Sequence, residues 1–221
     1  MRTIKQLSLK GLFLPAIALC SLLVVAGISE AAPVTFSFNG AVGEVTGVLF
    51  PTIGAGSMSG NVTFDSAATP IAPGTGVYLN SITGLNLNIG SYHASYTPGL
   101  LNGIVIMNSH PLGGADNVTA FSTMTGAAIN GTSPSSFLVS LTDPSGNVFS
   151  NLDLATTPPS LGSFASNQWR LVFGNGNMVV GSLSTLTAVP LPAAVILFGA
   201  GLISLVGLGA GGLRNLRRPQ A

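Results

Sequence analysis

The sequence predicts an all-β domain, a single β-sandwich or jelly-roll-like fold over residues 32–188. Three observations lead to this fold class. Short apolar runs alternate with Ser, Thr and Asn at a period of two, which is typical of strands with one buried face. Turn-forming sequences separate these runs. No window shows a helical period with charged flanks, so helices are not expected to build the core.

The alternation is clearest in five runs, in which apolar or aromatic residues occupy every second position. These runs are Phe36 and Phe38; Val62 and Phe64; Leu85, Leu87 and Ile89; Phe137, Val139 and Leu141; and Trp169, Leu171 and Phe173. Each run is expected to form a strand whose apolar side chains face the core. About eight to ten short strands of this kind are typical of a sandwich or jelly roll.

Turn chemistry marks the ends of several predicted strands. Residues 143–146 read Asp-Pro-Ser-Gly, which suits a type I turn with Asp first, Pro second and Gly fourth. Residues 174–177 read Gly-Asn-Gly-Asn between two apolar runs, which is a hairpin signal. Pro158 and Pro159 separate the run at 152–154 from the next predicted strand.

The charges are few and sort by position. Only 6% of the residues are charged and 47% are hydrophobic, whereas an ordinary soluble domain is about 25% charged. Between residues 32 and 213 there is one base, Arg170, against five acids, so the domain carries a net charge of −4. Such a domain has no basic surface for a phosphate backbone, and we expect no nucleic-acid partner.

The N-terminus has the three parts of a secretory signal peptide. Residues 1–10 carry three bases, residues 11–29 carry no charge, and Ser29-Glu30-Ala31 places small residues at −3 and −1 of a cut after Ala31. A cut after Ala32 is less attractive, because Pro33 would follow it. We expect residues 1–31 to direct Sec-type export; the alternative is an N-terminal anchor that is never cut.

The C-terminus predicts a transmembrane helix. Residues 193–213 form a stretch of 21 residues without a charge, and a helix of this length spans roughly 31 Å, which matches a bilayer core. The basic residues Arg214, Arg217 and Arg218 follow it. By the positive-inside rule this basic tail, residues 214–218, stays in the cytoplasm and the domain lies on the outer side.

A short motif precedes the span: Val189, Pro190, Leu191, Pro192 and Ala193. Together with the apolar helix and the terminal arginines, residues 189–221 resemble the VPLPA variant of the PEP-CTERM sorting signal. This resemblance implies an exosortase that processes the motif. It also implies a bacterial exported protein associated with extracellular polysaccharide and biofilm. Leu191 stands where the parent motif has Glu, so the particular exosortase stays open. The alternative is a plain membrane anchor.

The expected role is therefore that of a structural protein of the cell envelope or extracellular matrix. It would be anchored briefly in the inner membrane and then delivered to the surface. The alternative is a carbohydrate-binding module that contacts the extracellular polysaccharide. Tyr92, Tyr96 and Trp169 are the candidate aromatic platform, since aromatic faces stack on flat apolar ligand surfaces.

No motif for catalysis is found, so neither an enzyme nor a cofactor or metal site is expected. His93 and His110 lack the spacing of zinc ligands, and the only cysteine is Cys20. A glycosidase needs two facing carboxylates. Asp65 and Asp143 are explained as a strand end and a turn, which leaves Glu44, Asp116 and Asp153 as the acids from which a pair would come.

Overall fold

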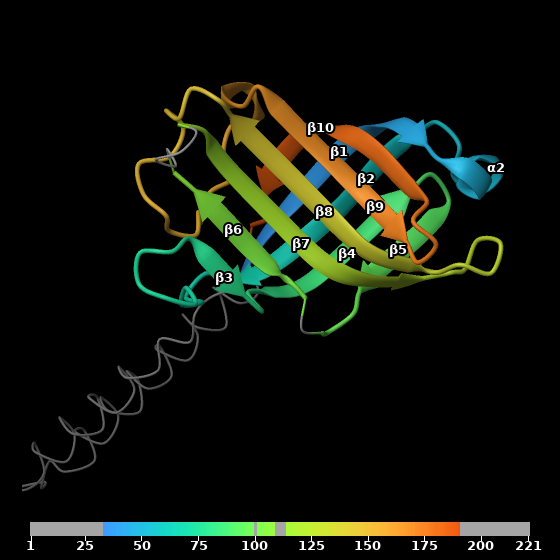
Figure 1. Cartoon of the computed structure of the whole chain (residues 1–221), viewed down its shortest axis with the longest axis horizontal. Coiled ribbons are helices and arrows are strands. Elements are labelled where there is room, and N and C mark those ends of the chain that lie inside the picture. The colour runs from blue at the N-terminus through green and yellow to red at the C-terminus, as the bar shows by residue number, and fades with distance from the viewer. Residues whose placement is uncertain (1–32, 100, 109–113, 191–221) are drawn as a thin grey trace, which may run out of the picture. The chain divides into compact units, whose positions relative to one another are not determined.

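The computed structural model describes residues 33–99, 101–108 and 114–190 (Figure 1). The predicted signal peptide with its cleavage site at Ala31 and Ala32 lies outside the described residues. The same holds for His110, for Leu191, Pro192 and Ala193 of the predicted sorting motif, for the predicted span and for the three terminal arginines.

The described chain is mostly β, which confirms the all-β prediction. Its ten strands are β1 (Pro33–Val45), β2 (Ser57–Asp65), β3 (Val77–Leu79), β4 (Ile82–Ile89), β5 (Tyr92–Tyr96), β6 (Gly103–Met107), β7 (Asp116–Gly126), β8 (Pro134–Asp143), β9 (Ser166–Phe173) and β10 (Met178–Ala188). Its short helices are η2 (Gly47–Leu49), α2 (Phe50–Ile53) and η3 (Leu161–Ser163).

Eight of the strands close into a barrel, so the prediction of a sandwich or jelly roll is wrong. Antiparallel pairs run in the order β1, β2, β4, β5, β7, β8, β9, β10, and β10 pairs with β1 again. The β7–β8 pairing closes what would otherwise be an open sheet. A sandwich and a barrel both bury every second side chain, so the alternation could not tell them apart.

Two further strands, β6 and β3, are attached to this ring: β6 pairs with β7, and β3 pairs with β6. One edge of β7 pairs with β8 along its length; on the other edge, Asn117–Phe121 pairs with β6 and Met124–Gly126 pairs with β5. The short strand β3 then pairs with β6. The wall of the barrel on this side is therefore made of two strand pieces in place of one long strand.

The barrel has two ends that differ in their loops (Figure 1). At one end β1 begins, β10 ends, and the long connections 66–76 and 144–165 lie; we call this the exit end. At the other, the far end, lie η2, α2 and the hairpin turn between β9 and β10.

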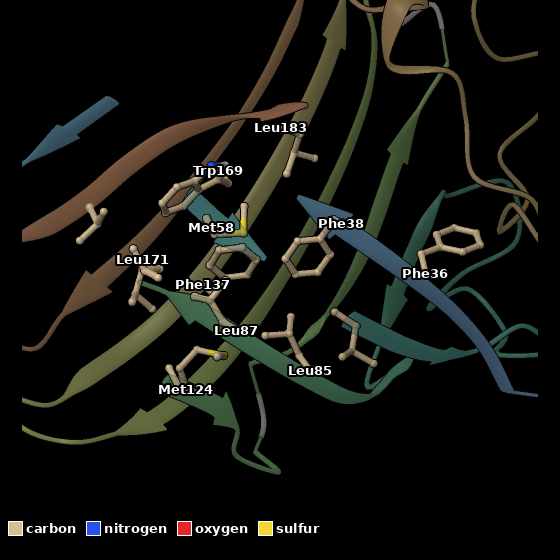
Figure 2. Close-up of a cluster of buried hydrophobic side chains, with 14 of the residues drawn as sticks. Phe36, Phe38, Met58, Leu85, Leu87, Met124, Phe137, Trp169, Leu171 and Leu183 are labelled. Carbon is tan, nitrogen blue, oxygen red and sulfur yellow. The ribbon is translucent and has the colours of Figure 1, made fainter. Parts of the chain in front are cut away.

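The inward positions carry the predicted core. Residues of all five alternating runs are buried or pack against the buried cluster. Figure 2 shows Phe38, Met58, Phe137 and Trp169 gathered in the interior, with Phe36 lying apart from them. Phe38 stacks on Phe137 with ring centroids 5.9 Å apart, and Phe137 lies 6.2 Å from Trp169.

Two predicted turns are confirmed. The Gly146 amide donates to the Asp143 carbonyl at 3.3 Å, and the Gly176 amide donates to the Phe173 carbonyl at 2.9 Å in the β9–β10 hairpin. The Leu152–Leu154 run is no strand but part of the 144–165 loop. Its leucines are partly buried against the barrel interior, which explains why an irregular segment is apolar.

Candidate functional site

The interior of the barrel contains an apolar cavity in the half next to the exit end. Its volume is about 110 Å³. Eighteen of its nineteen lining residues are apolar. The strands contribute Phe36, Phe38, Val62, Phe64, Leu85, Ile104, Ile106, Val118, Ala120, Phe137, Val139, Leu141, Leu183 and Leu186, and the 144–165 loop contributes Phe149, Asp153, Leu154, Ala155 and Pro159.

The cavity exists because several inward side chains of this half are short. Val118 and Ala120 of β7 and Val139 of β8 stand where larger side chains would reach the barrel axis. An eight-stranded barrel is just wide enough for side chains to fill it or for one small ligand to occupy it. At these positions the small inward residues leave space that no neighbouring side chain takes up.

Asp116 fixes the first part of the loop that covers the cavity. Its fully buried carboxylate accepts hydrogen bonds from the amides of Val148 and Phe149, each at 2.7 Å. Both distances lie at the short end of the range for N–H···O hydrogen bonds. Phe149 also packs against Phe164, with ring centroids 5.8 Å apart. The Phe149 side chain is thereby held against the cavity.

Tyr78 of β3 fixes the middle of the loop. Its buried hydroxyl donates a hydrogen bond to the Leu152 carbonyl at 2.8 Å. Burial, and to a smaller extent the negative charge of Asp153, raises the pKa of Tyr78 above its ordinary value of 10.0. The hydroxyl therefore stays protonated and available as a donor at neutral pH.

Asp143 organises the start of the loop. Its carboxylate accepts from the Ser145 hydroxyl at 2.6 Å and from the amides of Ser145 and Asn147 at 3.0 and 3.1 Å. The hydrogen bond from the Ser145 side chain is the main cause that lowers the pKa of Asp143, and the backbone amides add to it. An ionised Asp143 thus favours the turn that sends the chain over the barrel.

The rest of the 144–165 loop, which covers the cavity, is held by apolar contact. Within the described part of the chain, residues 154–159 form no hydrogen bond, while Leu154, Ala155 and Pro159 face the cavity. Asp153 is exposed and lies at the rim. It is the single charged residue of the lining, so a polar end of an occupant would meet it near solvent.

The acids singled out in the sequence do not all come together. Glu44 lies near the end of β1 and pairs with Val180 toward the far end, whereas Asp116 and Asp153 lie at the exit end. Among the described residues no group of three His, Cys, Asp or Glu is placed to hold a metal ion. His93 is exposed on β5, where its Nδ1 forms a hydrogen bond with Asn88 Oδ1.

The proposed aromatic platform is wrong. Trp169 is fully buried inside the barrel, with its indole N–H donating to the Ser182 carbonyl at 3.3 Å. Tyr92 is buried too and donates to the Ala127 carbonyl at 2.9 Å. Tyr96 is half-buried and packs against the core. These rings are inward residues of β5 and β9 and offer no shared face to a sugar.

The predicted sorting motif begins at the wall of the barrel. The Val189 amide still donates to the Thr35 carbonyl of β1 at 2.9 Å, and the Val189 side chain is 41% exposed. Pro190 is exposed and is the last described residue. None of the helices in the described ranges has the length and apolar character needed to cross a bilayer; the predicted span at 193–213 lies beyond them.

Sequence reasoning missed the cavity. The only signal for it was a pair of small inward residues, Val118 and Ala120, in a strand whose length was not predicted. Comparison with protein-family models, with curated proteins and with solved structures found no match to this chain.

Proposed function

We propose that the barrel is a non-enzymatic binding protein that holds one small apolar molecule in its interior. The observation that carries this proposal is the cavity of about 110 Å³ with eighteen apolar lining residues. A void of this size lowers stability by on the order of 2–3 kcal/mol relative to a filled interior. An apolar occupant recovers part of this loss, because its own surface leaves water.

The size of the cavity defines the class of occupant. An engineered apolar cavity of about 150 Å³ stays dry and binds benzene. The buried part of the ligand is therefore a single ring or a short branched chain. A larger molecule would keep its remainder at the rim, where Asp153 and solvent accept polar or cationic groups.

A matched pair of variants tests this binding. Ala120→Leu fills the cavity from inside β7, whereas Ala41→Leu adds the same atoms at an exposed position of β1. Saturating benzene should raise the melting temperature of the wild-type chain and of Ala41→Leu, because a ligand that binds only the folded state stabilises it. Ala120→Leu should lose this shift. Equal shifts in all three proteins, or none in the wild type, would refute the proposal.

The place of action in this proposal is outside the cytoplasm. The supporting observation is the order of the three C-terminal features: Val189 to Ala193, an uncharged stretch and Arg214, Arg217 and Arg218. Sec-type export would deliver the barrel across the inner membrane, the uncharged stretch would anchor it there, and an exosortase would then release it to the cell surface or the matrix. Cell fractionation with intact-mass measurement tests this route. A mature envelope protein that keeps residues 193–221 in an exosortase-positive strain contradicts the processing step.

A second candidate is contact with extracellular polysaccharide, in a structural biofilm role. It is favoured by the outer face of β1 and β2, where Thr35, Ser37, Asn39, Asn61 and Thr63 present hydroxyls and amides without charge. Such groups hydrogen-bond sugars without repelling acidic chains. Binding of the processed protein on a glycan array, lost in a double variant Ser37→Leu with Asn61→Leu, would support it. Unchanged binding in that variant would exclude this face.

A further inference from the structure

The outer surface of the barrel changes character at β3 and β6. Outward positions of β1 and β2 carry Ser, Thr and Asn, whereas those of β3 and β6 carry Val77, Leu79, Val105 and Met107. Leu79 is 44% exposed and Met107 is 40% exposed. The exposed residues Ile71 and Leu101 flank these strands. We call Ile71, Val77, Leu79, Leu101, Val105 and Met107 the outer apolar patch.

The strand register makes the patch continuous with its neighbours. Leu79 lies opposite Gly103, Gly103 opposite Phe121, and Phe121 opposite Leu138. Because Gly103 has no side chain, nothing in that row separates Leu79 from the outward ring of Phe121. Exposed apolar patches that extend over several strands mark contact sites for membranes or other proteins.

The patch and the cavity lie on opposite faces of β6. Ile104 and Ile106 of β6 point inward and line the cavity, while Val105 and Met107 point outward. The patch therefore belongs to the exit half of the barrel. Of the other exposed large apolar residues in the described ranges, Val48 and Phe50 lie at the far end, and Val189 lies at the exit end, where the chain leaves the barrel.

The length of the chain outside the barrel indicates what covers the patch. Val189 is still hydrogen-bonded to β1, and the predicted span begins at Ala193. Only residues 190–192 lie between them, which reach at most about 10 Å when fully extended. Two of these residues are prolines, which stiffen the linker. While the proposed C-terminal anchor holds the protein in the membrane, the exit end lies within this distance of the bilayer.

We infer that the outer apolar patch rests on the lipid bilayer while the protein is anchored, with the cavity end turned toward the membrane. This inference rests on the anchoring part of the proposed function and goes beyond it. An apolar ligand dissolved in the lipid then reaches the cavity end over a short path. The contact is apolar: the described barrel carries a single base, Arg170, and the patch carries none, so anionic headgroups are not required.

Site-specific fluorescence in liposomes tests this orientation. The full chain carries Cys20→Ser, so that a cysteine introduced elsewhere takes a single environment-sensitive label. Leu79→Cys reports on the patch, and Val48→Cys is a matched control at the far end, since Val48 is 43% exposed against 44% for Leu79. Met107→Cys is a second reporter in case Leu79→Cys fails to fold. The liposomes are phosphatidylcholine with a quencher in the acyl chains.

The label at 79 or 107 should lose most of its fluorescence to the lipid quencher, and the label at 48 should keep most of it. The result should not change when anionic lipid is added. Floating liposomes with equal signals at 48 and 79 would overturn the orientation but leave the anchor intact. Failure to float would overturn the anchor and the orientation together. Energy transfer between two labelled copies at 79, without lipid quenching, would assign the patch to a dimer and reject the bilayer.

Discussion

The two halves of the barrel interior use small residues in opposite ways. In the far half, Gly40 and Gly181 point inward, and large side chains fill the space they leave. A side chain at 181 would collide with the Trp169 ring and the Ala41 carbonyl, and one at 40 would collide with the Ser182 carbonyl and crowd Trp169 Nε1. In the exit half, Val118 and Ala120 are small too, yet no large neighbour fills the space.

The difference shows that a small inward residue creates a cavity only when no long side chain turns into the space that it leaves. Trp169 lies on β9 beside Gly181 of β10, so the far half is close-packed. In the exit half, residues of the 144–165 loop line the cavity together with the strands and leave it partly unfilled. One half thus stabilises the fold, and the other provides space for a ligand.

The largest expected effect is in the packed half. Trp169→Ala should lower the free energy of unfolding by about 3–5 kcal/mol, because a fully buried ring is lost and a void remains. Urea unfolding measures it. The neighbouring Arg170→Ala is the control: its side chain is exposed, and its effect should stay within about 0.5 kcal/mol. Similar losses in both variants would mean that the far half is not close-packed.

The second-largest loss of stability is expected from removal of the Asp116 carboxylate, which holds the 144–165 loop over the cavity. Asp116→Ala leaves the amides of Val148 and Phe149 without their acceptor and should cost about 3 kcal/mol. Amide hydrogen exchange should rise at these two positions first. Asp153→Ala, in the same cover but exposed, is the control and should change neither stability nor exchange. Protection at 148 and 149 that survives Asp116→Ala contradicts the role given to Asp116.

The same substitution in the two halves should have opposite signs. Ala94→Leu adds atoms to the packed interior of β5 and should destabilise by about 1–3 kcal/mol. Ala120→Leu adds them beside the cavity and should stabilise by roughly 1 kcal/mol, since it fills a void. Chemical unfolding of both variants measures the two changes in the free energy of unfolding. Destabilisation of equal size in both would show that the exit half is as full as the far half.

The smallest expected effect is on stability at acidic pH. The folded-state pKa of Asp143 is lowered, so its contribution is present above the unfolded pKa of about 3.9 and is lost as pH falls through the folded value. The stability of the wild type should therefore decline below about pH 4 more than that of Asp143→Asn. Urea midpoints at mildly and strongly acidic pH measure this. Parallel declines in the two proteins would assign the acid sensitivity to other groups.

The sequence predicted which residues face inward, but not how the strands close. Phe137, Leu141, Trp169 and Leu171 are buried as their alternation requires, because period two depends only on the local backbone. Closure depends on the pairing of β7 with β8 and of β1 with β10. β7 and β8 are consecutive strands, but the register of β1 with β10 is set by contacts between segments far apart in the sequence, which leave no local signal.

The candidate site was harder to predict than the fold. The side chains that hold its cover, Asp116 and Tyr78, lie on β7 and β3, and their partners lie in the 144–165 loop. The sequence offers Asp116 only as one of three acids from which a catalytic pair would come, whereas the turn at Asp143 follows from the local Asp-Pro-Ser-Gly sequence. The cavity depends on which inward side chains lie at the same level across the barrel. Only the three-dimensional register of the strands fixes this.

The pairing of β1 with β10 bears on when this chain can fold. β1 can pair early with β2, but the ring closes only when β10, the last strand, pairs with its other edge, where Phe36 lies opposite Ala188. Folds dominated by such remote pairings form slowly, because a long loop must be ordered before the contact forms. A chain that leaves the cytoplasm amino-terminus first would therefore remain unclosed during its passage. Its final shape would be reached only after the last strand has emerged.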